Sequence, residues 1–160
     1  MKRLMFTITL GLVFASVIVN QHAWGQNADP LNGTWHLNAE KSKFNAGPAI
    51  KSQTRVYEVS GDSVKQTVDG VDSQGKPIHS GFIAKYDGSD YPTTGNPDAD
   101  TISVKRIDAN NAKSILKKSG KVVQTVMRNV SKDGNTLTFK TQGTNAKGEK
   151  IDNVLVFERQ

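Results

Sequence analysis

Cysteine is missing from this 160-residue chain. Its absence excludes a disulfide framework, a thiolate zinc site, an iron–sulfur cluster and a cysteine nucleophile. Histidine is scarce as well: beyond the first 25 residues only His36 and His79 occur, and neither has a neighbour at metal-ligand spacing. We therefore expect no metal site and no cofactor.

Catalytic motifs are also absent. The chain has no Gly-x-Ser-x-Gly turn, no phosphate-binding glycine loop ahead of Lys-Ser or Lys-Thr, and no His-Glu-x-x-His. The acidic loops Asp69–Gly75 and Asp98–Asp100 lack the spacing and the terminal glutamate of a calcium loop. The sequence therefore predicts no enzyme and no catalytic residues.

A long apolar run occurs only near the N-terminus. Lys2 and Arg3 precede Leu4–Val19, a run shorter than a membrane-spanning helix needs, and Ala23-Trp24-Gly25 has the small residues of a cleavage site. We expect residues 1–25 to be a cleaved signal peptide, with a cut after Ala28 as the alternative. Residues 26–160 would then form a single domain, periplasmic or secreted, with no transmembrane segment.

The positive charge is unevenly placed. Loss of Lys2 and Arg3 lowers the formal charge from +6 to +4. Residues 29–100 are then net −3, and residues 101–160, with 12 basic and 5 acidic side chains, are net +7. No basic cluster alternates with aromatics, as stacking on bases requires, so we expect no nucleic-acid partner. An envelope polymer or protein remains open as a partner.

What the chain does have is a regular succession of short β-type runs. From Trp35 onward, segments rich in Val, Ile, Thr, Phe and Tyr are separated every eight to twelve residues by Gly, Asp and Asn. The predicted strands are Thr34–Leu37, Ser52–Ser60, Ser63–Asp69, Ile78–Tyr86, a short one at Tyr91, Thr101–Ile107, Ala112–Lys117, Val122–Val130, Thr136–Gln142 and Ile151–Arg159. Consecutive hairpins predict an all-β, antiparallel up-and-down barrel of 8 to 10 strands, since closure removes exposed edges.

Two segments depart from this pattern. Ala39–Phe44, preceded by Asn38 as a cap, has room for one or two turns of helix. Thr94–Asp100 contains Gly95 and Pro97 and no periodicity, which predicts a loop of the kind that covers the mouth of a barrel.

An internal repeat relates two parts of the chain. A shift of 73 positions places Arg55 on Arg128, and it also superposes three pairs of glycines. Each copy reads strand, tight turn, strand, loop, strand. Because the two arginines match, both are candidates to point into the barrel, where a guanidinium requires an acceptor or an anionic ligand. Outward placement is the alternative.

The first and last predicted strands carry a resemblance. Gly33-Thr34-Trp35 and Phe157-Glu158-Arg159 make the chain similar to the calycin superfamily of lipocalins and fatty-acid-binding proteins. In those families a Gly-x-Trp opens the barrel and a basic residue late in the last strand packs over the tryptophan. The resemblance implies that Trp35 and Arg159 close the barrel.

A second resemblance covers nearly all of the mature chain. Asp90–Pro92, Thr94–Asp100, Lys105–Asp108 and Ser131–Gly134 look like a group of small bacterial secreted proteins called lipocalin-like, which brings no activity with it.

The usual carboxylate clamp of fatty-acid-binding proteins is missing. That clamp places an Arg and a Tyr just before a Glu on the last strand, and here those places hold Leu155 and Phe157 before Glu158. The departure favours a neutral or differently held ligand. We accordingly expect a neutral apolar probe to bind better than a fatty acid of equal length.

Together these features predict a non-enzymatic barrel that binds a small, partly hydrophobic molecule. The alternative is a filled barrel that acts through its outer surface. The predicted ligand-binding residues are inward candidates on the strands: Tyr57, Phe82, Tyr86, Phe157, Arg55 and Arg128.

Overall fold

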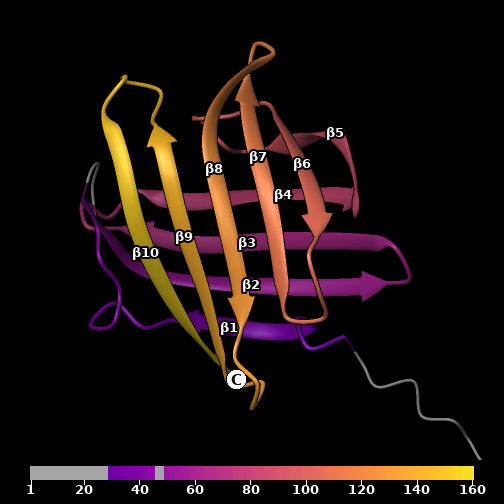
Figure 1. The fold of residues 1–160 in the computed structure, drawn as a ribbon. Helices are drawn as coiled ribbons and strands as arrows, with labels where there is room; N and C mark the ends of the chain where they lie inside the picture. The colour runs from indigo at the N-terminus through magenta and orange to yellow at the C-terminus, as the bar shows by residue number, and fades with distance from the viewer. Residues whose placement is uncertain (1–28, 46–48) are drawn as a thin grey trace, which may run out of the picture.

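Ten antiparallel strands form a closed barrel in the computed structural model, which describes residues 29–45 and 49–160 (Figure 1). Each strand pairs with its neighbour in sequence, and β1 pairs with β10 to close the ring. The strands are β1 (Gly33–Leu37), β2 (Ile50–Ser60), β3 (Ser63–Asp72), β4 (Pro77–Lys85), β5 (Asp87–Thr94), β6 (Thr101–Arg106), β7 (Asn111–Lys118), β8 (Lys121–Val130), β9 (Thr136–Thr144) and β10 (Lys150–Arg159). The all-β, up-and-down barrel predicted from the sequence is confirmed.

The predicted signal peptide, residues 1–25, lies outside the described residues. No helix among the described residues is long and apolar enough to cross a membrane.

Alternation along each strand gives the barrel its core. In β8, for example, Gln124, Arg128 and Val130 are buried and Val126 on the same face is half-buried, while the alternate residues Thr125, Met127 and Asn129 face outward. The same two-residue period in the other strands buries Trp35, Val64, Leu137 and Phe157 almost completely. One contiguous hydrophobic cluster results.

The internal repeat has a structural counterpart. The first copy folds as β2, β3 and β4, and the second as β8, β9 and β10. The matched glycines Gly70 and Gly143 both lie against the preceding strand: a Cβ on Gly70 would approach the Ser52 carbonyl oxygen to 2.3 Å, and one on Gly143 would approach that of Val123 to 2.0 Å. Only glycine allows this close approach of backbones.

β5 is the strand that the sequence describes least well. A short strand at Tyr91 was expected, and eight residues, Asp87–Thr94, form one. Asp, Gly and Ser have low β-propensity, so the first half gives no strand signal. β5 pairs with β4 at only two positions, and Pro92, which has no N–H to donate, pairs with Thr101 of β6.

The helical turn expected over Ala39–Phe44 does not form. Asn38 does cap a turn, since its side-chain oxygen accepts the Lys41 N–H at 3.0 Å. The chain then extends beside β10, where Lys43 and Val154 exchange both backbone hydrogen bonds. Strand addition satisfies these backbone groups in place of a helix.

The expected loop between β5 and β6 does lie across one end of the barrel. Ala99 is buried, and the Asp98 carboxylate accepts the Ala146 backbone N–H at 2.8 Å and the Gln124 side-chain amide at 3.4 Å. The Ser119 N–H donates to Asp100 at 2.8 Å. These bonds fasten the loop to the β7–β8 and β9–β10 turns at the same end.

Candidate binding interior

The end of the barrel opposite the β5–β6 loop is called the sealed end. It is formed by residues 29–32 and by the turns β2–β3, β6–β7 and β8–β9. Trp35 is fully buried there, and its indole N–H donates to the Leu31 carbonyl at 2.9 Å. The Arg159 guanidinium lies 4.2 Å from the Trp35 ring centre, and the two residues are partners in the β1–β10 register.

Arg159 fastens three segments together. Its nitrogens donate to the carbonyl oxygens of Pro30, Asn32 (2.6 Å) and Gly134 (2.6 Å), which joins the N-terminal segment to the β8–β9 turn. Gly33 has a φ of +125°, and a Cβ there would lie 2.7 Å from the Arg159 Nη1. The Gly-x-Trp element therefore has a physical reason: the glycine leaves room for the arginine that covers the tryptophan.

A second arginine of the sealed end, Arg106, was not predicted from the sequence. The Arg106 Nη2 lies 2.6 Å from the Asp29 Oδ2, and its guanidinium stacks 4.1 Å from the Tyr86 ring centre. Arg106 follows Ile102 and Val104 at two-residue spacing, so strand alternation carries the signal that would have placed it inward.

The inward face is incompletely buried in the middle of the barrel. Several inward-facing side chains are only half-buried although the residues on either side of them along the same face are buried. Arg55 lies between Gln53 and Tyr57, Ser114 between Ala112 and Leu116, and Val126 between Gln124 and Arg128. The exposure is therefore not an effect of the barrel ends, and this part of the inward face is less tightly covered than its neighbours.

Arg55 lies on this half-buried part of the inward face. Its Nε donates to the Gln53 Oε1 at 2.9 Å. Its guanidinium lies 4.3 Å from the Phe139 ring centre and 4.8 Å from that of Phe157. The two phenylalanines meet edge to face with centroids 5.6 Å apart. Phe139, which the sequence analysis did not include in the site, thus brings Arg55 and Phe157 together.

Arg128 is the most buried of the interior arginines, with 8% of its surface exposed. It is the register partner of Phe139, so Phe139 has Arg55 over its ring and Arg128 beside it on the next strand. Among the described residues, its Nη1 and Nη2 reach only the Tyr86 hydroxyl, at 3.5 and 3.4 Å, and its buried Nε has no hydrogen-bond partner.

The structure divides the predicted ligand-binding residues into groups. Arg55 and Phe157 lie together, and Arg128 lies with Tyr86. Phe157 is fully buried and belongs to the core more than to a pocket wall. Tyr57 accepts a hydrogen bond from the Gln66 amide, and Phe82 is the register partner of Gln66 on β4.

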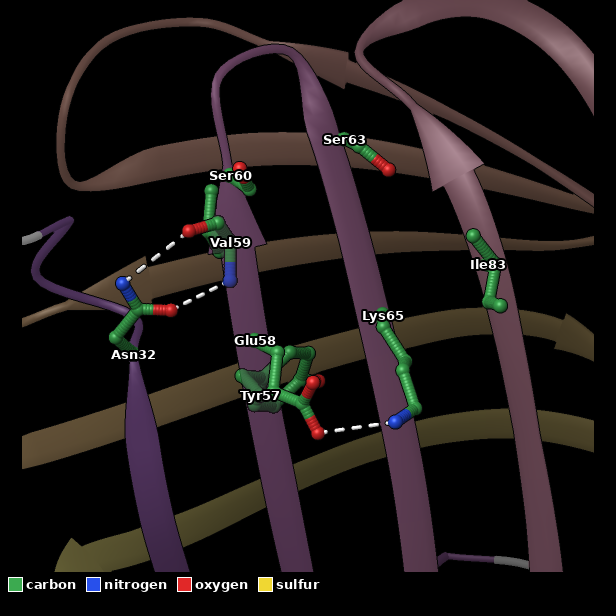
Figure 2. Close-up of a pocket in the computed structure, with 8 residues that line it drawn as sticks. All are labelled: Asn32, Tyr57, Glu58, Val59, Ser60, Ser63, Lys65 and Ile83. Carbon is green, nitrogen blue, oxygen red and sulfur yellow. Dashed lines mark hydrogen bonds and ion pairs between the residues drawn. The ribbon is translucent and has the colours of Figure 1, made fainter.

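Two open grooves lie outside the barrel. The first, of about 490 Å³, runs over the outer wall of β2, β3 and β4, where the Glu58–Lys65 ion pair (3.0 Å) and the exposed Ile83 lie (Figure 2). Asn32 closes one side through its hydrogen bonds to Val59. The second, also about 490 Å³, separates the β6–β7 and β8–β9 turns and is lined mainly by polar residues.

Both histidines in the described part of the chain lie at the surface. His36 contacts Thr54 and Gln160, and His79 lies 2.6 Å from the exposed carboxylate of Asp69. In the described part of the chain, no three potential metal ligands of the His, Asp or Glu type gather in one place.

No family model and no curated protein matches this chain. Solved structures with some likeness include EF1p2_mFAP2b bound to DFHBI, at 10% identity over 82% of this chain and 94% of that one, with a TM-score of 0.49. Zebrafish ileal bile acid-binding protein complexed with cholic acid follows at 11% identity, 82% and 99% coverage and a TM-score of 0.48. The redesigned β-barrel mFAP0, bound to DFHBI, has 15% identity, 81% and 99% coverage and a TM-score of 0.43.

The closed, up-and-down barrel is shown by this chain's own strand order and by the pairing of β1 with β10.

Proposed function

We propose that this protein is a non-enzymatic barrel that binds a small, partly apolar molecule in its interior. The observation that carries the proposal is the half-buried, inward-facing middle of the closed barrel, around Arg55, Ser114 and Val126. We further propose that the protein works in the periplasm or outside the cell after loss of residues 1–25. The support for that step is the charge, run length and cleavage pattern of the sequence.

The energetics allow useful affinity. Burial of apolar surface yields about 25 cal/mol per Å², so a contact of about 300 Å² contributes several kcal/mol before ordering costs. Affinity near the micromolar range follows.

Titration with a neutral, polarity-sensitive dye such as Nile red tests binding. The chain from Gln26 onward should give saturable fluorescence at roughly micromolar concentrations. Val126→Phe places bulk inside the barrel and should weaken binding about tenfold, whereas Ile83→Gln in the outer groove should leave it unchanged. The reverse result would place the dye in the groove of Figure 2.

Absence of saturable binding at tens of micromolar would favour the alternative, a filled barrel that docks through its outer wall. Export has its own test, N-terminal sequencing of the exported protein. The first residue should be Gln26 or, with the alternative cut, Asp29. A form that begins at Met1 and pellets with membranes would contradict export.

A further inference from the structure

The outer wall of the barrel is divided by charge. Strands β6–β9, which lie side by side on one face (Figure 1), comprise 33 residues, of which eight are basic and none is acidic. On the wall of β2–β4, by contrast, acidic side chains accompany the basic ones, and Lys65 pairs there with Glu58. We call the outer face of β6–β9 the cationic wall.

Four lysines lie in a single row across this wall. The strand register places six residues opposite one another in turn, and we call them the lysine row: Lys105, Lys113, Met127, Lys140, Val154 and Lys43. All four lysines are exposed. Because neighbouring strands lie about 4.8 Å apart, the lysines follow one another at intervals of about 5 to 10 Å.

The protein itself does not neutralise the row. None of the ion pairs among the described residues includes one of these four lysines. Asp87 is the register partner of Lys105, but its carboxylate accepts the Ser89 N–H and the Tyr91 hydroxyl instead. Like charges directly opposite each other, as at Lys105 and Lys113, destabilise a sheet. An anion bound along the row would relieve this repulsion.

A polar groove adjoins the row. Asn111 and Asn129 face outward, each two positions along its strand from a member of the row, and both line the groove between the β6–β7 and β8–β9 turns. The other polar residues that line it are Asp108, Asn110, Ser131 and Lys132. Amides and hydroxyls donate and accept hydrogen bonds, as the hydroxyl groups of a sugar require.

The cationic wall lacks the features that other anionic partners need. Phe139 is the only aromatic residue of β6–β9, and it is buried inside the barrel. The wall therefore has no ring for stacking on bases, and no Trp or Phe to insert into a bilayer. Met127 is exposed, but it lies between two lysines of the row.

We propose that the lysine row and the adjoining groove bind an acidic polysaccharide. Its anionic groups pair with the lysines, and its hydroxyl groups form hydrogen bonds in the groove. Contacts that are weak singly add up when a polymer engages several of them together. The inference goes beyond the proposed function, because this surface lies outside the barrel and the proposed ligand lies inside.

Titration of labelled polymers tests the chemistry of the partner. Fluorescent polygalacturonate oligomers, with dextran and poly-L-glutamate of equal length, are titrated with the chain from Gln26 onward, and anisotropy reports binding. Polygalacturonate should bind saturably and more weakly as salt is added, poly-L-glutamate at least about threefold more weakly, and dextran not at all. No binding of polygalacturonate, or equal affinity for either other polymer, would overturn the proposal.

Two double variants with the same change in net charge locate the contact. Lys113→Gln/Lys140→Gln removes two lysines of the row and should weaken polygalacturonate binding about 5- to 30-fold. Lys51→Gln/Lys76→Gln removes two exposed lysines from β2 and the β3–β4 turn, and should weaken it less than about twofold. Equal losses in the two variants would show that only net charge matters and would refute the assignment.

The groove and the membrane alternative have separate tests. Asn129→Ala should weaken polygalacturonate binding about two- to fivefold and leave poly-L-glutamate binding unchanged, and no effect on polygalacturonate would remove the groove from the site. Vesicles of phosphatidylglycerol and phosphatidylcholine should not sediment the protein at physiological ionic strength. Sedimentation that requires Lys113 and Lys140 would make the cationic wall a lipid-binding surface and overturn the proposal.

Discussion

The sealed end and the middle of the barrel use the same side chain in opposite ways. At the sealed end, Arg159 donates to three backbone carbonyls and Arg106 pairs with Asp29. In the middle, Arg128 has no ionic partner among the described residues and an unused Nε. The arginines of both regions have an aromatic neighbour: Arg159 lies over the Trp35 ring, and Arg128 lies near the Tyr86 ring. Contact with an aromatic ring therefore does not distinguish the two regions.

The difference teaches which arginines serve the fold. A guanidinium that donates to several acceptors stabilises the segments that it joins, and its removal leaves those acceptors unpaired. An unmatched buried guanidinium costs stability in the unliganded protein. Such a stability cost is typical of functional sites, because the groups that activity requires are often not those that make the fold most stable.

The largest effect is expected at Arg159. Arg159→Ala should lower the free energy of unfolding by about 3 kcal/mol, because three charge-assisted hydrogen bonds and the stacking on Trp35 disappear together. Urea denaturation measures the loss. In a double-mutant cycle with Trp35→Phe, the coupling energy should be about 0.5 to 2 kcal/mol. Strictly additive losses would mean that the stacking contributes nothing to closure.

Replacement of Arg106 and of Arg128 by methionine should change the stability of the unliganded protein in opposite directions. Arg106→Met should destabilise the unliganded protein by about 1 to 3 kcal/mol, because it leaves the Asp29 carboxylate without its cation. Arg128→Met removes an unpaired charge and keeps similar bulk, so stability should stay equal or rise by about 1 kcal/mol. Denaturation of both variants without ligand makes the measurement. A large loss in Arg128→Met would show that its long contacts to Tyr86 hold the fold after all.

Substitution by the larger leucine side chain tests how tightly the sealed end and the middle of the barrel are packed. Ala84 is 1% exposed and pairs with the fully buried Val64 near the β2–β3 turn of the sealed end, so Ala84→Leu should cost about 1 to 3 kcal/mol through overpacking. Thr141 is half-buried, shares the inward face of β9 with Phe139 and is the register partner of the half-buried Val126 in the middle of the barrel. Thr141→Leu should therefore cost less than about 1 kcal/mol. Thermal unfolding of the two variants gives the comparison, and equal costs would mean that the middle is as tightly filled as the sealed end.

The sequence carries much of this arrangement because alternation is a local property. The period of two identifies the inward faces of β2 and β8, and the repeat links Arg55 with Arg128. Partners are not local. Asp29 lies 77 residues from Arg106, and nothing in the spacing of the two shows that they meet. For the same reason the lack of a partner for Arg128 becomes visible only when all of its neighbours are known.

Local propensity also fails to predict the structure of β5 and of the segment after β1. Asp87–Asp90 has no strand signal, yet it is drawn into the sheet by pairing with β6. No helix forms at Lys43 because its backbone makes two hydrogen bonds with β10. In both places tertiary pairing outweighs local propensity.

The smallest expected effect concerns the turns of the sealed end and its pH dependence. The Asp108 carboxylate accepts hydrogen bonds from the Asn111 side chain and from the backbone N–H groups of Asn110 and Asn111, and these hold its pKa below the ordinary value of 3.8. A pKa that is lower in the folded state adds stability that is fully present above the unfolded value and is lost as the pH falls through the folded one. Asp108→Asn should therefore be less stable than the unaltered protein at about pH 6, and the difference should shrink at about pH 3 and below. Urea denaturation at both pH values measures it. Glu40→Gln, at an exposed carboxylate that accepts no hydrogen bond from the described residues, is the control and should show no such difference. A gap between Asp108→Asn and the unaltered protein that stays constant with pH would mean that the turn is held by the geometry of the side chain and not by its charge.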